Sequence, residues 1–378
     1  MLIDYPIYIN YLFAKAGNTA SPLSGTFELT PRCTLDCKMC YIHRRENDAS
    51  ALRGEKSTEW WLDKAKTAAE KGMLILLLTG GEPLLRKDFD EIYSYCRSLG
   101  VLMNVNTNGT LLTDDKIKLF SENKPQRVNV TLYGASRETY QALCGRGEAF
   151  DAVHDGILKL KEAGVNVKLN YSVTPLNRDD MNKAFAFSKK HGIPLQAVTY
   201  MYPPVRVCDG AACREEALRL NAEEAAHAQF DYRRFQLGDE GLLRAIRLFR
   251  KGDPTGVPAD ECTDLIGEKI RCRAGYTSFW ITWDGIMRPC GMMTEPGFDA
   301  SDFEAAWQAV RAAREKIIMP AKCLNCDLKA ICDSCAAATF AETGRFDGVP
   351  SYLCEKARIY NKICKEFADK FPENDIKE

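Results

Sequence analysis

The stretch TPRCTLDCKMCY at residues 30–41 decides the fold, because it places three cysteines, Cys33, Cys37 and Cys40, in the spacing C-x3-C-x2-C. Three thiolates on one short loop can ligate three irons of a four-iron cluster and leave the fourth iron without a protein ligand. Thiols at short spacing also form tetrahedral zinc sites, and reduced cysteines can simply pack in a core. Because His43 follows Cys40 too closely to complete a relaxed tetrahedron, we favour the cluster over zinc.

A second motif, TGGEP at residues 79–83, follows the apolar run MLILLL at residues 73–78. A short apolar run bounded by glycines predicts a buried parallel strand. Gly80 and Gly81 allow the backbone to approach a ligand closely, and Pro83 fixes the direction in which the chain leaves the turn. On its own this motif is also typical of an ordinary strand-to-helix turn, so its meaning depends on the cysteine triplet.

Together the two motifs resemble the signature of radical S-adenosylmethionine (radical SAM) enzymes, with Met39 at a position where that family prefers an aromatic residue. The resemblance implies that the three cysteines bind a 4Fe-4S cluster whose open iron is chelated by the amine and carboxylate of SAM. It also implies that the turn Gly80, Gly81, Glu82 and Pro83 holds the methionine amino group of SAM, and that Tyr41, after the third cysteine, is a further SAM-binding residue.

Charge and composition limit the class of partner. With 51 basic and 52 acidic side chains the net charge is -1, which favours neither a nucleic acid nor a membrane surface as a partner. The N-terminus lacks a basic segment followed by a long apolar one, and no apolar run approaches the roughly 20 residues that span a bilayer. We therefore expect a cytoplasmic protein, in which 16 cysteines indicate metal ligation rather than disulfides.

From Gly25 to about Pro204, short apolar runs alternate with amphipathic stretches, which is the pattern of repeated βα units around a parallel sheet. The predicted fold is α/β, with a partial (β/α)6 TIM-type barrel. We expect strands near 26–30, 73–79, 102–106, 127–132, 165–173 and 195–202, and helices near 60–71, 88–99, 114–122, 150–163 and 179–191.

In parallel α/β folds, ligands gather at the C-terminal ends of the strands. This rule places the cysteine loop and the Gly-Gly-Glu-Pro turn on one rim of the barrel. By resemblance, the later strands of radical SAM barrels contact the ribose and carboxylate of SAM, which implies Asn106, Asn108, Thr131 and Ser172 in this chain. Each of these four residues could instead cap a turn.

A second group of cysteines lies toward the C-terminus. The pair Asp284-Gly285, flanked by strand-forming residues, predicts a β-hairpin that brings Cys290 near Cys272. Five further cysteines follow at short and medium spacings: Cys323, Cys326, Cys332, Cys335 and Cys354. The alternative to iron-sulfur clusters in this region is a pair of structural zinc sites, which would stabilise a small domain equally well.

This second group resembles the SPASM extension of radical SAM enzymes, although Cys335 arrives one residue earlier than in that family. The resemblance implies two auxiliary 4Fe-4S clusters with crossed ligation. The outer cluster would be bound by Cys323, Cys326, Cys332 and Cys354, and the inner one by Cys272, Cys290 and Cys335. Cys262 is the candidate fourth inner ligand, and the alternatives are a buried free thiol at Cys262 or an open iron.

The motifs divide the chain into five parts. These are an N-terminal segment at 1–24, the radical SAM partial barrel at 25–207, a helical bridge at 208–260, a small cysteine-rich SPASM domain with the hairpin at 261–365, and a tail at 366–378. Within the bridge, residues 214–250 predict two helices. Cys96 and Cys364 lack ligand spacing and are expected in helix cores.

The resemblance implies reductive cleavage of SAM to methionine and a 5′-deoxyadenosyl radical that abstracts hydrogen from a substrate. Known SPASM enzymes act mostly on peptides or proteins, so we expect a maturase of a ribosomally made peptide that forms a thioether, a carbon-carbon crosslink or a similar oxidation. A flavodoxin or ferredoxin would supply electrons. Only about thirty residues precede Cys33, which weakens the peptide prediction unless a separate protein recognises the leader or the substrate docks on an edge strand.

Three alternative functions remain open at this point. A sulfatase-maturase-like formylglycine-forming enzyme is disfavoured, because Gly291 and Met292 follow Cys290 where an acidic residue is expected. A non-catalytic iron-sulfur electron carrier is disfavoured because it needs no SAM-binding turn at 80–83. A small-molecule tailoring enzyme stays open, since no motif defines the substrate pocket or a catalytic acid or base.

Overall fold

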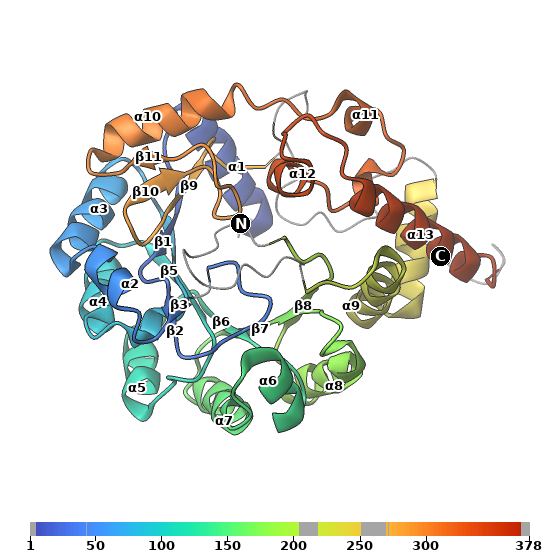
Figure 1. The fold of residues 1–378 in the computed structure, drawn as a ribbon, viewed down its shortest axis with the longest axis horizontal. Coiled ribbons are helices and arrows are strands. Elements are labelled where there is room, and N and C mark those ends of the chain that lie inside the picture. Colours follow the sequence, from blue (N-terminus) through green and yellow to red (C-terminus); the bar gives the residue numbers. More distant parts are fainter. Residues whose placement is uncertain (1–4, 43, 204–217, 251–269, 271, 372–378) are drawn as a thin grey trace.

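The computed structural model describes residues 5–42, 44–203, 218–250, 270 and 272–371. Its framework is a nine-stranded sheet in the order β11-β10-β9-β1-β4-β5-β6-β7-β8. Figure 1 shows the strands arranged around an open ring, with helices on the outer side. Six neighbouring strands pair in parallel: β1 (Ser24–Glu28), β4 (Ile75–Thr79), β5 (Leu102–Thr107), β6 (Arg127–Thr131), β7 (Val167–Ser172) and β8 (Leu195–Val198).

These six strands confirm the α/β partial barrel predicted from the apolar runs. Their alternate side chains point outward and are buried under the helices, as Leu76, Leu78 and Val105 show with no exposed surface. The opposite side chains face the interior of the ring and are mostly polar and half-buried. β8 ends four residues earlier than predicted, because the chain after Val198 turns toward the C-terminal region.

The predicted outer helices are confirmed as α3 (Thr58–Glu70), α4 (Phe89–Ser98), α5 (Asp114–Glu122), α7 (Ala149–Glu162) and α8 (Met181–His191). Hydroxyl caps fix two of their starts, since Ser57 accepts from Trp60 N and Thr113 accepts from Lys116 N. The sequence patterns did not predict α1 (Tyr5–Asn18), α2 (Ala49–Gly54), α6 (Arg137–Cys144) or the short 3-10 turns η1 (Pro83–Leu85) and η2 (Arg178–Asp180).

The hairpin predicted around Asp284-Gly285 is confirmed, with Gly285 at a φ of +88° that suits glycine. Its strands are β9 (Ser278–Ile281) and β10 (Ile286–Arg288), and β11 (Phe298–Asp299) pairs with β10. β9 also pairs in parallel with β1, so the hairpin extends the barrel sheet. Phe279 of β9 lies 6.3 Å from Phe27 and 5.2 Å from Phe303 of α10 (Phe303–Arg314), measured between ring centroids. Barrel and hairpin therefore share one hydrophobic core.

The remaining C-terminal elements are α9 (Ala222–Arg250), α11 (Ala321–Leu324), the 3-10 turn η4 (Lys329–Ile331), α12 (Ala336–Thr343) and α13 (Ser351–Ala368). α9 is broken at Gly238, where φ is 67° and ψ is 173°, so it consists of the two helices that were predicted. Residues 208–217 and 251–260 of the expected bridge lie outside the described residues. Cys364 packs between α9 and α13, and Cys96 is buried in α4, which confirms both as core residues. Within the described ranges, no helix is long and apolar enough to cross a bilayer.

The shared core predicts that damage to the hairpin destabilises the barrel. Phe279→Ala removes a side chain that is 2% exposed and contacts both Phe27 and Trp307. The free energy of unfolding is expected to fall by about 3–5 kcal/mol. Urea unfolding followed by circular dichroism measures this change. The control Ile318→Ala, at a side chain that is 55% exposed, is expected to change it by less than about 0.5 kcal/mol. If Phe279→Ala disrupted the hairpin but left the urea unfolding transition of the barrel unchanged, this result would contradict the shared core.

Candidate functional site

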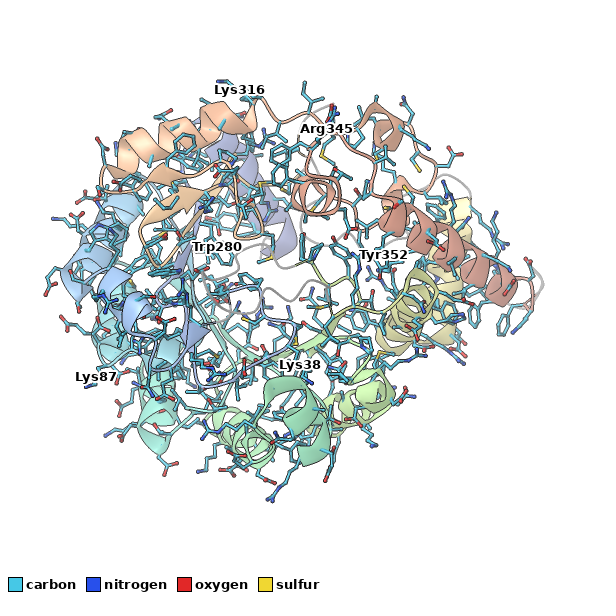
Figure 2. The ribbon with its side chains drawn as sticks, in the orientation of Figure 1. Lys38, Lys87, Trp280, Lys316, Arg345 and Tyr352 are labelled. Carbon is cyan, nitrogen blue, oxygen red and sulfur yellow. The ribbon has the colours of Figure 1, made fainter. Side chains whose placement is uncertain are left out.

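The cysteine loop leaves the C-terminal end of β1 and is closed by a short parallel pair, β2 (Arg32–Cys33) and β3 (Arg44–Arg45). It is held against the C-terminal end of α6. Asp36 N donates to Cys144 O at 3.0 Å, and Lys38 N donates to Leu143 O at 2.9 Å. Figure 2 shows Lys38 of this loop beside α6. These bonds fix the loop on the rim where the strand order places it.

The three thiols of this loop lie close enough to influence one another. Cys37 is buried, Cys33 and Cys40 are half-buried, and none of them forms a disulfide. Burial raises the pKa of the Cys33 thiol above its usual range, and the neighbouring thiols of Cys37 and Cys40 raise it further. The side chains of Cys144 and Tyr133 hydrogen-bond to Cys37. A bound metal or cluster would deprotonate such thiols, because its positive charge stabilises the thiolate.

The donor set fits a polynuclear group. Among the described residues, no three His, Cys, Asp or Glu side chains are grouped closely enough to hold a single metal ion. The three thiols nevertheless lie on one loop, and the pKa of Cys33 is raised by the neighbouring Cys37 and Cys40. An iron-sulfur cluster matches three such sulfurs, because thiolates are the ligands that it prefers.

The Gly-Gly-Glu-Pro turn after β4 lies directly against the backbone of the cysteine loop. Gly81 N donates to Thr30 O at 2.7 Å, and Glu82 N donates to Arg32 O at 2.8 Å. A Cβ atom at Gly80 would lie 2.4 Å from Thr30 O, and one at Gly81 would lie 2.4 Å from Arg32 O. Both glycines are therefore required by the close approach of the two loops.

Glu82 links the turns that follow β4 and β5. It has no exposed surface, and its carboxylate accepts hydrogen bonds from Leu84 N at 3.0 Å, Thr107 Oγ1 at 2.8 Å and Asn108 N at 2.7 Å. Burial raises the pKa of this carboxyl to about 7, although the three hydrogen bonds favour the charged form. The carboxylate is thus engaged within the protein, and the backbone of the turn faces the loop.

Asn108 connects this turn to the cysteine loop. Its Nδ2 donates to Cys33 Sγ at 3.3 Å and to Thr34 Oγ1 at 3.0 Å, and its Oδ1 accepts from Thr110 N at 2.9 Å. The side chain is 3% exposed. These contacts use the amide group fully, so Asn108 acts here as a brace of Cys33.

The other predicted SAM contacts lie on the inner face of the barrel or beside the cysteine loop. Asn106 Oδ1 accepts from Asn129 Nδ2 at 2.8 Å on the neighbouring strand. Thr131 and Ser172 are half-buried at the last positions of β6 and β7. Tyr41 is half-buried directly after Cys40. The strand order brings these side chains to the same rim as the cysteine loop.

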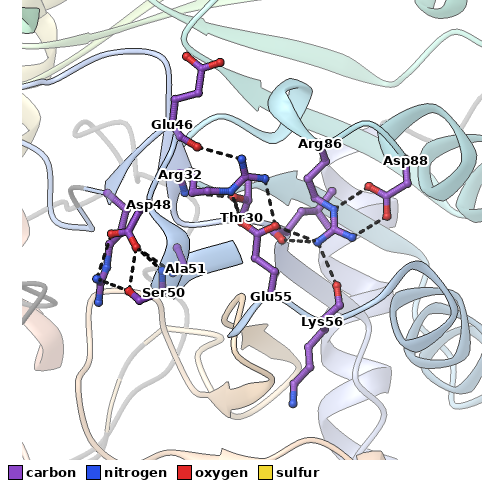
Figure 3. A network of polar contacts seen from close by, with 12 residues as sticks. Thr30, Arg32, Glu46, Asp48, Ser50, Ala51, Glu55, Lys56, Arg86 and Asp88 are labelled. Atoms are coloured by element: carbon purple, nitrogen blue, oxygen red, sulfur yellow. Dashed lines mark hydrogen bonds and ion pairs between the residues drawn. The ribbon is translucent and has the colours of Figure 1, made fainter. Parts of the chain in front are cut away.

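A buried ionic network supports the start of the cysteine loop (Figure 3). Glu55, which caps α2, accepts from Arg32 Nε at 2.6 Å, and its carboxylate lies 3.8 Å from Arg86 Nη1. Arg86 donates to the Asp88 carboxylate at 2.9 and 2.6 Å and to Leu29 O at 3.0 Å. The sequence analysis missed this network, because its members come from separate segments and share no local pattern.

The described C-terminal cysteines form two adjoining groups, and Cys332 and Cys335 both pack against one apolar cluster that contains Tyr200 and Leu353. Cys272, Cys290 and Cys335 pack against one apolar cluster that includes Met293 and Ile317. In the other group, burial raises the pKa of Cys332 to about 11, with the thiols of Cys354 and Cys323 contributing. Cys326 is exposed between α11 and η4. Cys262 lies outside the described residues.

Arg314 supports the loop that carries Cys272. Its guanidinium donates from Nη2 to Ile270 O at 2.7 Å and from Nε to Ala274 O at 3.1 Å, on either side of the cysteine. Arg314 is 4% exposed, so this contact is buried. Sequence reasoning missed it, since an arginine near the end of an amphipathic helix is ordinarily a surface residue.

The sequence model of the Radical SAM superfamily matches residues 27–187. One curated relative is the AdoMet-dependent heme synthase of Methanosarcina barkeri (strain Fusaro / DSM 804), which is 27% identical over 87% of this chain and 95% of its own length. Another is the sporulation killing factor maturation protein SkfB of Bacillus subtilis (strain 168), which is 26% identical over 78% of this chain and 65% of its own length.

Solved structures share the fold over nearly the whole chain. Native anSMEcpe with bound AdoMet superposes with a TM-score of 0.67 at 18% identity and covers 92% of this chain and 100% of that one. Streptococcus suis SuiB bound to its precursor peptide SuiA gives a TM-score of 0.63 at 18% identity, covering 94% of this chain and 82% of that one. At such identities the likeness establishes the fold.

The contact between the two loops predicts the effect of Gly81→Ala. The new Cβ would clash with Arg32 O, so the turn and the cysteine loop must separate. The free energy of unfolding is expected to fall by about 1–3 kcal/mol, and Cys33 in the iron-free protein should be alkylated faster. Urea unfolding and mass spectrometry after alkylation measure these effects.

The matched control is Gly241→Ala in α9, where a Cβ meets only the Leu237 side chain at 3.2 Å. It is expected to leave the alkylation rate of Cys33 unchanged. Equal alkylation rates in the Gly81 variant and the unaltered protein would show that the glycine does not position the cysteine loop.

Proposed function

The chain belongs to the radical SAM superfamily, and from that premise we propose that it is a SAM-dependent peptide maturase, with Cys33, Cys37 and Cys40 holding the 4Fe-4S cluster. The single observation that carries this proposal is the three-thiol loop braced by the Gly80–Pro83 turn. When bound, the cluster and SAM supply the electron and the 5′-deoxyadenosyl radical that abstracts hydrogen from the substrate.

The residues of this chain would bind and orient SAM and the substrate, and would exclude water from them. The Gly80–Pro83 turn is proposed to hold the methionine end of SAM, and Glu82 fixes this turn against Asn108. Asn106, Thr131 and Ser172 offer polar groups on the rim for the rest of SAM. Tyr41, which directly follows Cys40, is proposed as a further SAM contact.

The inner face of the barrel favours a peptide substrate. Besides the residues proposed to bind SAM, it carries the neutral amide side chains Asn129 and Asn170. Asn129 Oδ1 is buried without a hydrogen-bond partner, next to Asn106. Amide groups of this kind match the N–H and C=O groups of a peptide backbone.

Charge on this face supports the same substrate class. Glu28 is fully buried at the end of β1, where its carboxylate accepts from Trp280 Nε1 at 3.2 Å. Lys168 is bonded to Gln196, and Arg127 lies at the start of β6, at the end of the strand away from the rim. The described side chains of this face that lie toward the rim are mostly neutral, which suits a neutral peptide backbone.

Two auxiliary 4Fe-4S clusters in the region 261–365 complete the proposal. The inner one would use Cys272, Cys290 and Cys335, and the outer one Cys323, Cys326, Cys332 and Cys354. The electrons would come from a flavodoxin or ferredoxin, and a separate leader-recognition protein would deliver the peptide. The shared apolar cluster of Cys272, Cys290 and Cys335, and the influence of Cys323 and Cys354 on Cys332, support this assignment.

The first experiment tests SAM cleavage. Anaerobic protein supplied with dithionite and SAM is expected to form methionine and 5′-deoxyadenosine, measured by chromatography and mass spectrometry. Cys37→Ala should reduce the product to the level without protein, because it removes a cluster ligand. Cys96→Ala, a buried cysteine of α4, is the matched control and should retain activity. Absence of 5′-deoxyadenosine at full iron content would contradict the proposal.

The second experiment separates the substrate classes. A candidate precursor peptide co-expressed with the protein should lose two hydrogens by mass spectrometry, and this loss should depend on Cys37. A carboxylate-bearing tetrapyrrole, suggested by the name of one relative, should remain unchanged under the same conditions. SAM-dependent loss of carboxylate carbon from the tetrapyrrole would overturn the peptide assignment while leaving the radical chemistry intact.

A further inference from the structure

Tyr202 joins the rim of the barrel to the inner cysteine group. It lies four residues after the end of β8 and packs with Cys272, Cys290 and Cys335 in the same apolar cluster. Its hydroxyl lies 3.4 Å from Cys335 Sγ. No sequence motif marks this tyrosine, because the contact joins residues 133 positions apart in the chain.

The sulfur of Cys335 receives a second hydrogen bond from the backbone. Cys335 is the N-cap of α12, and its Sγ accepts from Ala338 N at 3.4 Å. The N-terminus of a helix favours a negatively charged group. A ligating thiolate carries no proton, so in that state the Tyr202 hydroxyl must be the donor of the bond that it shares with Cys335. Two donors thus converge on this one sulfur.

The neighbouring Tyr200 has a different partner. Its ring packs against Tyr202 with a centroid distance of 4.9 Å and an interplanar angle of 63°, but its hydroxyl donates to Glu342 Oε1 at 2.8 Å. Arg219 also bonds to Glu342. The Tyr352 ring, labelled in Figure 2, lies 6.1 Å from the Tyr200 ring. This aromatic packing holds the Tyr202 ring in place, so its hydroxyl stays directed at Cys335.

We propose that Tyr202 is a positioning residue for the inner auxiliary cluster, whose hydroxyl donates to the Cys335 sulfur and raises the reduction potential of that cluster. The inference rests on the cluster assignment made under the proposed function. Hydrogen bonds to ligand sulfurs stabilise the reduced form, which carries more negative charge. Tyr202 belongs to the barrel rim. The bond therefore also links the position of the rim to the inner auxiliary cluster.

The test is the reduction potential of the auxiliary clusters in the full chain, followed by electron paramagnetic resonance during a redox titration. Tyr202→Phe keeps the ring and removes the donor. The ratio of oxidised to reduced inner cluster at a fixed potential is expected to rise about tenfold, which corresponds to a potential lower by about 59 mV for one electron. Tyr200→Phe removes an equivalent hydroxyl that bonds to Glu342, and is expected to leave the potential unchanged.

The iron content separates the possible outcomes. Iron for one cluster only, in the unaltered protein, would overturn the auxiliary clusters themselves. Iron for three clusters with the same potential in Tyr202→Phe as in the unaltered protein would overturn the role of Tyr202 alone, as would an equal shift in Tyr200→Phe. Selective loss of one cluster from Tyr202→Phe, with all clusters retained in Tyr200→Phe, would support the proposal, because partners of metal ligands also strengthen binding.

Discussion

The contact between two backbones, the cysteine loop and the turn after β4, is the constraint on which the rest of the site depends. Gly81 N and Glu82 N bond directly to carbonyls of the loop, and the space between them admits no Cβ atom. The buried carboxylate of Glu82 then ties the same turn to Asn108, whose amide reaches Cys33 Sγ. The cysteine loop, the turn after β4 and the turn after β5 are thereby joined around Cys33, which is the preorganisation that a reactive cofactor requires.

A buried ionic network supports the start of the same cysteine loop. Glu55 bonds to Arg32 and lies near Arg86, and Arg86 is further held by Asp88. Removing one member would leave a buried charge unpaired, at a cost of about 3–5 kcal/mol. The network therefore makes displacement of the loop energetically costly and keeps its thiols on the rim of the barrel.

The sequence predicted the parts that local patterns encode. Apolar runs and amphipathic stretches predicted the six strands and the five outer helices, and Asp284-Gly285 predicted the hairpin. Contacts between distant segments were not predictable, because neither the pairing of β9 with β1 nor the bond from Tyr202 to Cys335 leaves a local pattern. The contact of Asn108, a predicted SAM residue, with Cys33 Sγ likewise joins distant segments and leaves no local pattern.

The central claim is that three thiols hold a cluster with one iron open to SAM. The most direct measurement is electron-nuclear double resonance on the anaerobically reduced protein, with SAM that carries nitrogen-15 at its amino group. The account predicts a hyperfine coupling between this nitrogen and the cluster that is lost when SAM is omitted. A cluster whose spectrum is the same with and without labelled SAM would contradict it.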